Sequence, residues 1–406
     1  MKRRGAGVNA ASLSAFGGKA GEEMKIMLSA GEVSGDLHGE RLAHAIHEKE
    51  PRVELIGFGG ARMERAGVRL FRNFADYNVM GVLEVIQNFC RIMKLLDALT
   101  AFMKRERPDL LVIIDYPDFN WRLARRAKAL GIPVFSYIPP SAWAWRKGRA
   151  KDCAKIADEF VAIFPHELPP YEAAGAKIAF VGNPLVDTVR AEIQPEAARA
   201  FFGAPEGEHI VLLMPGSRRQ EITMLLGPML GAAKILLARR ADTRFFLPVA
   251  DASYENVIQA KIEAAGVPVT LVRENRYALM AIADAAVAAS GTVVMEAALM
   301  GMPCVTVYRL SWLNYWIGRA LVHIDHFTLP NILMGERIQP ELLQDEVEPK
   351  RIADELERLY RGNPNRAAVT AKLRKAAARL GAPGAAGRIA ERILAAARHS
   401  KTGTKD

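Results

Sequence analysis

Residues 285–298 read A-A-V-A-A-S-G-T-V-V-M-E-A-A: an apolar strand-like stretch, a Ser-Gly-Thr turn and the start of a helix. Such strand–turn–helix units are the repeating element of doubly wound α/β folds. Ser290, Gly291 and Thr292 place backbone N–H groups and hydroxyls at a helix start, where the helix dipole favours a phosphate or diphosphate. Glu296 follows one turn later, within reach of the hydroxyls of an attached ribose. The stretch predicts a nucleotide site, with simple capping of the helix by the turn as the alternative.

The same alternation of strand-like and helix-like stretches recurs along the chain from Lys25 onward. A first series of apolar strands, separated by amphipathic helical stretches, reads K-I-M-L-S-A, V-E-L-I-G-F, D-L-L-V-I-I-D, I-P-V-F-S-Y and E-F-V-A-I-F. A second series reads H-I-V-L-L-M-P, T-R-F-F-L-P-V, V-P-V-T-L-V, A-A-V-A-A and M-P-C-V-T-V-Y. This alternation is typical of parallel sheets with helices on both faces. We predict an α/β fold of two doubly wound, Rossmann-like domains across a cleft, with ligands at the carboxyl ends of both sheets.

An Asn-Pro turn at Asn183 and Pro184 separates the two series and marks the expected boundary. We expect residues 1–23 to be a disordered extension, since they are rich in Gly, Ala and Ser and have no apolar core of a signal peptide. Residues 24–184 and 185–370 then form the two domains. Residues 371–406 are expected to be C-terminal helices, and packing back onto the first domain is one arrangement open to them.

Composition narrows the classes of function. The chain has 406 residues, of which 50% are hydrophobic, and its formal net charge of +10 suits an anionic partner such as a nucleotide, a phosphorylated lipid or an acidic membrane. Nothing in the sequence supports a nucleic-acid partner. No apolar run reaches the 18 residues of a membrane span. The three cysteines lie far apart and without metal-ligand spacing, and no D-x-D occurs, so we expect no disulfide, no zinc, no metal-bridged diphosphate and no cofactor.

The stretch I-I-D-Y-P-D-F-N, residues 113–120, carries the candidate catalytic group. Asp115 comes at the carboxyl end of a buried strand and Asp118 follows after a proline. A carboxylate at a strand end, beside apolar neighbours, is suited to take a proton from a hydroxyl nucleophile. We predict that Asp115 is a general base and that Asp118 caps a helix beginning near Phe119. The alternative is that Asp115 only orders the turn.

Two glycine-containing turns complete the candidate cleft. In G-E-V-S-G-D, residues 31–36, Glu32 and Ser34 are candidates to bind polar groups of an acceptor, and Asp36 is a candidate helix cap. A strand-to-helix turn without a ligand explains the same residues equally well. In P-G-S-R-R-Q-E-I, residues 215–222, we predict that Arg218 reaches the diphosphate and neutralises the charge that develops as the nucleotide leaves.

Two aromatic or apolar segments have two interpretations each. Trp143, within S-Y-I-P-P-S-A-W-A-W-R at residues 136–146, either lines a sugar or acyl site or packs between the domains. Residues 79–96 have a helical apolar stripe that is wider than a usual core face. This segment either contacts a membrane interface or acyl chains, or is a fully buried helix. Its expected lipid-contacting side chains are Val82, Val85, Ile86, Phe89 and Met93.

Eight motifs in unbroken order, within residues 24–350, make the chain resemble the lipid-A-disaccharide synthase family of inverting glycosyltransferases. They are A-G-E-V-S-G-D, N-V-M-G-V-L-E-V-I, I-D-Y-P-D-F-N, P-S-A-W-A-W-R, P-G-S-R, A-S-G-T-V-V-M-E-A, V-Y-R-L-S and F-T-L-P-N-I-L-M-G. The resemblance implies a GT-B fold and metal-independent chemistry. It implies Asp115 as the base, Arg218 as a phosphate contact and Glu296 as a ribose contact. It also implies Asn331, of L-P-N, near the nucleotide.

The resemblance also implies the reaction and its place. 2,3-Diacylglucosamine would pass from its UDP derivative to the 6-hydroxyl of 2,3-diacylglucosamine 1-phosphate, giving a β-1,6 disaccharide 1-phosphate and UDP. Residues 24–184 would form the acceptor and membrane side, and residues 185–370 would bind the UDP-sugar. The expected location is cytoplasmic, peripheral on the cytosolic face of the inner membrane. The oligomeric state stays open, with a homodimer as one alternative.

Two other classes of protein remain as alternatives. A UDP-sugar epimerase would use the same cleft and Glu296, but it would need no lipid and no apolar 79–96 surface. A non-catalytic nucleotide-binding or membrane scaffold protein would have no use for Asp115 at a strand end. Incubation with a UDP-sugar alone would reveal the epimerase, and UDP binding without turnover would reveal the scaffold protein.

Overall fold

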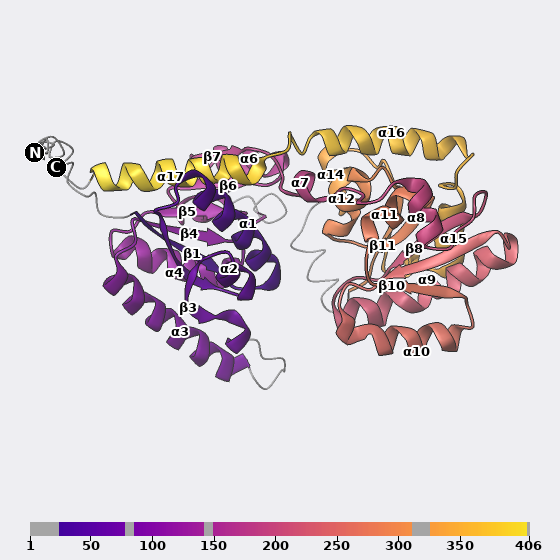
Figure 1. The fold of residues 1–406 in the computed structure, drawn as a ribbon, viewed down its shortest axis with the longest axis horizontal. Coiled ribbons are helices and arrows are strands. Elements are labelled where there is room, and N and C mark those ends of the chain that lie inside the picture. The colour runs from indigo at the N-terminus through magenta and orange to yellow at the C-terminus, as the bar shows by residue number, and fades with distance from the viewer. Residues whose placement is uncertain (1–23, 78–84, 142–148, 311–324, 404–406) are drawn as a thin grey trace, which may run out of the picture.

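The computed structural model describes residues 24–77, 85–141, 149–310 and 325–403. These residues form two all-parallel sheets with helices packed around them (Figure 1). The first sheet has seven strands in the order β3-β2-β1-β4-β5-β6-β7 and the second has six in the order β10-β9-β8-β11-β12-β13. In each sheet the chain starts at an inner strand, β1 or β8, and adds two strands on one side of it. It then returns and adds the remaining strands on the other side, as in doubly wound folds. The predicted α/β fold class is confirmed.

The first sheet contains β1 (Lys25–Ala30), β2 (Glu54–Gly59), β3 (Arg69–Asn73), β4 (Leu110–Ile114), β5 (Val134–Tyr137), β6 (Glu159–Ala162) and β7 (Ile178–Phe180). Every residue of β4 is buried, as expected for a parallel strand covered on both faces. Helical segments around this sheet are α1 (Val33–Lys49), α2 (Ala61–Arg65), η1 (Phe74–Tyr77), α3 (Val85–Glu106), α4 (Pro117–Ala129), α5 (Arg149–Ala154), η3 (Pro165–Glu167), α6 (Leu168–Glu172) and α7 (Leu185–Thr188).

The second sheet contains β8 (His209–Met214), β9 (Thr243–Pro248), β10 (Val269–Val272), β11 (Ala285–Ala289), β12 (Cys304–Tyr308) and β13 (Glu341–Leu343). Helical segments of this half are α8 (Pro195–Phe201), α9 (Arg219–Arg239), η4 (Ala252–Tyr254), α10 (Glu255–Ala265), α11 (Arg276–Ile282), α12 (Thr292–Leu299), α14 (Leu329–Met334), η5 (Gln344–Glu346), α15 (Pro349–Glu357) and α16 (Pro364–Ala378).

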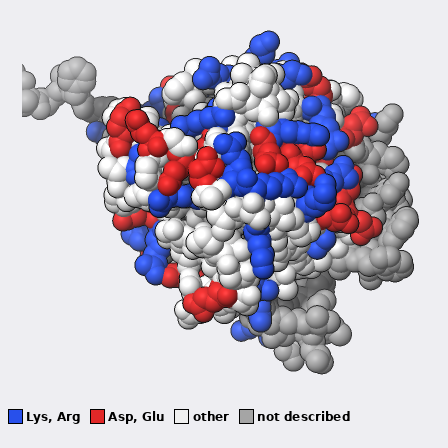
Figure 2. Space-filling view, turned by 90° about the vertical axis from the view of Figure 1, so that its right-hand side faces the viewer, with Lys and Arg blue, Asp and Glu red and all other residues white. Residues whose placement is uncertain are grey.

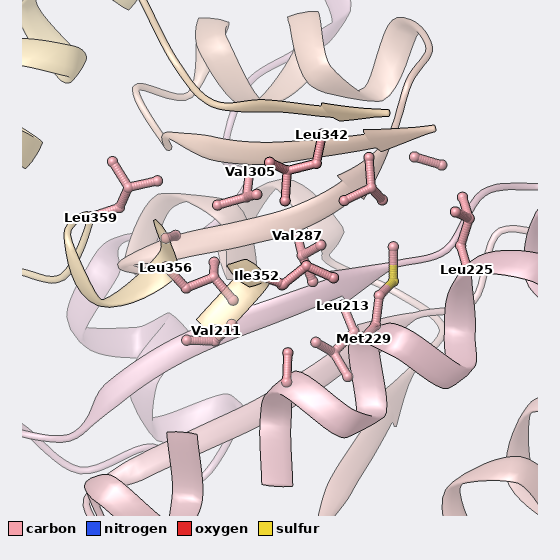
Figure 3. Packing of buried hydrophobic residues seen from close by; sticks show 14 of the residues in the cluster. Val211, Leu213, Leu225, Met229, Val287, Val305, Leu342, Ile352, Leu356 and Leu359 are labelled. Atoms are coloured by element: carbon pink, nitrogen blue, oxygen red, sulfur yellow. The ribbon is translucent and has the colours of Figure 1, made fainter. Parts of the chain in front are cut away.

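Alternate residues of the strands pack on opposite faces of each sheet. In the first sheet, Met27 and Leu111 belong to a core cluster with residues of α3 and α4, whereas Leu28 and Val112 belong to a cluster with residues of α1. In the second sheet, α9 and α15 cover one face (Figure 3). Side chains of β8, β11, β12 and β13 meet those of these two helices there, and the labelled ones are Val211, Leu213, Leu225, Met229, Val287, Val305, Leu342, Ile352, Leu356 and Leu359.

The last helix, α17 (Ala385–Gly403), returns to the first half of the molecule. It lies along the first sheet's side of the structure, while α16 lies along the second (Figure 1). Buried residues of α17, including Ile389 and Ile393, share a core cluster with α1 and β4. The chain therefore crosses between the two halves twice, once near Asn183 and again between α16 and α17. The exact domain boundaries at residues 184 and 370 stay a prediction.

Helix α9 has the length and apolar composition of a helix that crosses a membrane, the one such case among the described residues. Its buried side chains, including Leu225 and Met229, belong to the core against β8 and α15. A buried position in the core explains its composition. Figure 2, which looks onto the second half of the molecule, shows Lys and Arg side chains interleaved with Asp and Glu. This face therefore presents mixed charge, although the chain as a whole is basic.

Candidate active site

Asp115 projects from a strained turn at the carboxyl end of β4. Asp115 and Tyr116 have φ angles of 49° and 52°, in the left-handed region that side chains other than glycine seldom adopt. The turn is fixed by Asn120, whose Nδ2 donates to the Asp115 carbonyl (2.7 Å) and whose Oδ1 accepts from Ser29 Oγ (2.7 Å). Gly31 makes room for the Tyr116 ring, because a Cβ at Gly31 would lie 2.1 Å from Tyr116 Cδ1. Strain held by such contacts is typical of functional sites.

Burial raises the pKa of the Asp115 carboxyl to about 6, and the charge of Glu32 adds to this effect. A hydrogen bond from the Tyr116 backbone acts in the opposite direction. A general base works best when its pKa lies near the working pH. Ser34 Oγ donates to Glu32 Oε1 (2.9 Å), so the predicted Glu32 and Ser34 pair lies close enough to Asp115 to influence it.

Asp115 lines a cavity of about 580 Å³ between the two halves of the molecule. Its walls are the segments that follow β4, β5 and β6, together with Leu329 at the start of α14. The first three are the carboxyl ends of adjacent strands in the first sheet, and Leu329 comes from the second half of the molecule. This is the place where open parallel sheets bind ligands.

A larger cavity, of about 870 Å³, lies between α17 and the amino ends of β5 and β6. Its charged lining residues pair with each other: Glu159 accepts from Arg392 Nε (2.8 Å) and pairs with Lys177, and Lys128 pairs with Asp158 (2.9 Å). Because this edge is remote from the strand ends that carry Asp115, we assign the reaction to the smaller cavity.

The Ser-Gly-Thr turn leads from β11 into α12, whose first residue is Thr292. Ser290 Oγ donates to the Phe327 carbonyl (3.2 Å), and no side chain caps the first turn of α12. Simple capping by the turn, the alternative interpretation, therefore does not describe α12. Its first amide groups keep the capacity to bind an anion.

Glu296, on the second turn of α12, is 8% exposed and forms an ion pair with Arg276 (Oε2 to Nη2, 3.1 Å). The Arg276 side chain is 51% exposed and donates to the Tyr277 hydroxyl (2.7 Å). The expected contact of Glu296 with a ribose stays a prediction, and the structure places Arg276 beside this carboxylate. Sequence reasoning missed Arg276, because the turn at residues 274–276 has no motif that links it to Glu296.

Arg218 is the N-terminal cap residue of α9, and its side chain is 80% exposed. Glu221 fixes the preceding turn, since its Oε2 accepts from the backbone N–H groups of Ser217 (3.0 Å) and Arg218 (3.2 Å). Gly216 has a φ of 105°, and a Cβ there would lie 2.1 Å from Glu221 Oε2. The sequence analysis did not single out Glu221. Its position three residues after the cap is the signal of a capping box.

The structure corrects two predictions. Asp118 caps no helix, because α4 begins at Pro117 and the left-handed Tyr116 precedes it; Asp118 is exposed in the first turn. Asp36 accepts from the N–H groups of Gly60, Arg62 and Met63, and so caps α2 rather than its own helix.

Asn331 is fully buried and supports the loop between α14 and β13. Its Oδ1 accepts from the N–H groups of Ile338 (3.0 Å) and Gln339 (3.2 Å), and its Nδ2 donates to the Gln339 carbonyl (3.1 Å). These bonds hold the loop in place, and the expected position of Asn331 near the nucleotide stays a prediction.

The remaining predicted residues lie partly beyond what the structure describes. Trp143 and Val82 are outside the described residues, and so are the side chains of Val85, Ile86 and Phe89, although helix α3 begins at Val85. Met93 is half-buried and packs against the core of the first sheet. The interpretation of residues 79–96 as a lipid-contacting surface stays a prediction.

Comparison with known proteins identifies the family. The family model described as lipid-A-disaccharide synthetase matches residues 26–391. The chain is 42% identical to a lipid-A-disaccharide synthase of Syntrophus aciditrophicus over 370 residues, which cover 91% of this chain and 97% of the relative. It is 40% identical to that of Geobacter sulfurreducens, over 91% of this chain and 96% of the relative. The chain belongs to the lipid-A-disaccharide synthase family.

Membership of the lipid-A-disaccharide synthase family makes this protein a glycosyltransferase of lipid A biosynthesis, as the eight motifs predicted. Solved structures confirm the GT-B fold of this lipid-A-disaccharide synthase family member. UDP-GlcNAc 2-epimerase from Neisseria meningitidis, bound to UDP-GlcNAc, superimposes with a TM-score of 0.63 at 14% identity, over 91% of this chain and 100% of that one. A glycosyltransferase from Rickettsia africae gives 0.55 at 12% identity, over 92% and 99%.

Proposed function

We propose that this protein transfers 2,3-diacylglucosamine from UDP-2,3-diacylglucosamine to the 6-hydroxyl of 2,3-diacylglucosamine 1-phosphate, with inversion at the anomeric carbon. The observation that carries the proposal is Asp115, a carboxylate of raised pKa in a cavity that both halves of the molecule line. Family membership supports a UDP-sugar donor and a sugar acceptor.

In the proposed step, Asp115 takes the proton of the acceptor 6-hydroxyl as its oxygen bonds to the anomeric carbon of the donor. The bond from that carbon to the diphosphate oxygen breaks, and UDP leaves with the bonding electron pair. The uncapped start of α12 and the exposed Arg218 are suited to stabilise the leaving diphosphate. A single displacement converts an α donor into a β linkage.

The direct experiment combines the purified protein with both proposed substrates and EDTA. Mass spectrometry should detect a tetraacyl disaccharide 1-phosphate and an equal amount of UDP, and NMR should show a β-1,6 linkage. Omitting the acceptor should give no epimerised UDP-sugar, which separates this activity from that of the epimerases sharing the fold. Absence of disaccharide with both substrates present contradicts the proposal, and loss of activity in EDTA contradicts its metal independence.

We further propose that the protein acts as a peripheral protein on the cytosolic face of the inner membrane. The diacylated substrates and the wide apolar stripe of residues 79–96 support this location. Sedimentation with anionic lipid vesicles tests it. Replacing Ile86 and Phe89 by serine should reduce the bound fraction, and equal binding of the variant and the parent protein would contradict the assignment of this segment.

A further inference from the structure

A second carboxylate, that of Glu167, lines the cavity of Asp115. Glu167 ends η3, the short turn after β6, and is only 4% exposed. Its Oε2 accepts from the backbone N–H groups of Phe164 (3.0 Å) and Ile163 (3.2 Å). Ile163 and Phe164 are themselves lining residues, so Glu167 holds part of the wall of the cavity that Asp115 lines.

Capping alone does not explain a buried carboxylate at this position. A neutral side chain can accept the same two hydrogen bonds without the cost of removing a charge from water. The negative charge of Asp115 acts on Glu167, so the two carboxylates of this cavity lie close enough to interact.

Two like charges in one partly dry cavity influence each other's protonation. Burial raises the pKa of Glu167 to about 7, and the negative charge of Asp115 adds to the rise, whereas the two backbone hydrogen bonds oppose it. Burial likewise raises the pKa of Asp115, to about 6. The two carboxyls therefore titrate as a coupled pair near neutral pH.

Other described groups also lie near this pair. His166, also in the lining, is kept neutral because burial lowers its pKa to about 4. Asp118 is exposed to water, and Glu32 acts on Asp115 from the loop after β1. Helix α14, which packs on η3, contributes the apolar Leu329.

We propose that Glu167 is a positioning residue for glycosyl transfer, which holds the Ile163–Phe164 wall and, when ionised, makes Asp115 a stronger base by like-charge repulsion. This inference rests on the proposed role of Asp115. It assigns to Glu167 a charge effect that a purely structural cap would not have.

The chain offers a matched control for this charge. Glu346 ends η5, another three-residue turn, and its Oε2 accepts from the Leu343 backbone N–H (3.1 Å). Glu346 lies outside the lining of the cavity and pairs with Arg351 (3.1 Å). Glu167→Gln and Glu346→Gln thus each remove a charge from the same kind of capped turn, and only the first removes it from the cavity.

The test measures kcat/KM from pH 5 to 9 for the parent protein and both variants. In Glu167→Gln the pH of half-maximal activity on the acid side should fall by about half a unit, and the plateau kcat should drop by up to about threefold because Asp115 is a weaker base. Glu346→Gln should follow the parent. An unchanged acid limb in Glu167→Gln would overturn the inference.

A measurement on the parent protein keeps the inference testable if Glu167→Gln does not fold. Its acid limb should require two ionisations, near pH 6 and pH 7, and a limb that fits one ionisation would contradict the role of Glu167. A parent protein that forms no disaccharide at any pH would instead refute the proposed function, so the two failures are distinguishable.

Discussion

At the scale of the residue, Arg218 offers the clearest test of the proposed binding site for the diphosphate of UDP. Its side chain extends from the start of α9 into solvent, with Glu221 Oε1 at 3.9 Å as its acidic neighbour. Arg218→Ala should weaken inhibition by UDP about tenfold and lower kcat about 10²-fold, because it removes positive charge from the leaving diphosphate. Arg219→Ala, also exposed and one residue further on, is the control and should change both by less than about threefold. Equal effects of the two variants would count against Arg218.

The buried carboxyl of Glu167 predicts how stability depends on pH. Its pKa is about 7 in the folded protein against 4.5 for an ordinary glutamate, so the native state binds more protons between these values. Stability from this group is therefore present below pH 4.5 and lost as the pH rises through 7. Glu167→Gln should raise the Tm relative to the parent by several degrees more at pH 8 than at pH 4.5. Calorimetry checks this, and a difference that is the same at both pH values would contradict it.

Candidate site residues could be predicted from the sequence where their neighbours along the chain mark them. Residues that are brought to the site only by contacts with distant segments could not. Asp115 was recognisable because it follows a buried strand directly. Arg276 and Glu167 gain their roles from contacts with other segments, which no spacing along the chain reveals. Asn331 was expected near the nucleotide from its motif, and the structure adds that its side chain supports the loop between α14 and β13.

At the scale of the element, the turn before α9 depends on Gly216. Gly216→Ala would force a side chain into the left-handed region and against Glu221, the group that caps the helix. We expect a loss of stability of about 2–4 kcal/mol and weaker UDP inhibition. Gly207→Ala is the control, because Gly207 also has a positive φ, of 90°, but nothing lies within 4 Å of its added Cβ. It should cost only about 1 kcal/mol. Equal losses in urea denaturation would contradict the clash.

Strands were predicted better than helix starts, and the reason is physical. Buried parallel strands are continuous apolar runs, so β4 and β11 could be read directly from composition. The start of a helix depends on which side chain accepts hydrogen bonds from its first backbone N–H groups, and that side chain can come from a distant part of the sequence. Asp36 caps α2 across a strand, and the turn at Tyr116 starts α4 before Asp118, so neither acid caps the helix expected from local order.

At the scale of the whole molecule, α17 joins the end of the chain to the first sheet. Ile393 is fully buried in the cluster that contains α1 and β4 residues. Ile393→Ala should destabilise the protein by about 2–5 kcal/mol, because it leaves a cavity in this core. Glu391→Ala, on an exposed part of the same helix where Glu391 pairs with Lys49, should cost less than about 1 kcal/mol. Similar unfolding midpoints for the two variants would show that α17 is not part of the cooperative core.

The two-domain plan could be predicted from the repeated strand–helix rhythm, but the cavity could not. Its walls come from three strand ends of one sheet and from Leu329, more than 200 residues after Asp115 in the chain. Likewise, the order of strands that places β4, β5 and β6 side by side is a property of the folded sheet. The sequence pointed to Asp115 as a candidate base, and the structure adds the enclosure that raises its pKa.

The most direct test of the account is the rate of disaccharide formation by Asp115→Asn, measured together with the Kd for UDP. Asparagine keeps the size of the side chain and tolerates the left-handed backbone, so the turn should survive while the base is lost. We expect kcat to fall by about 10² to 10⁴ with the Kd for UDP nearly unchanged. The control Asp152→Asn, at an exposed carboxylate outside the lining of this cavity, should retain most of the activity. Near-normal turnover by Asp115→Asn would contradict the central claim that this carboxylate deprotonates the acceptor.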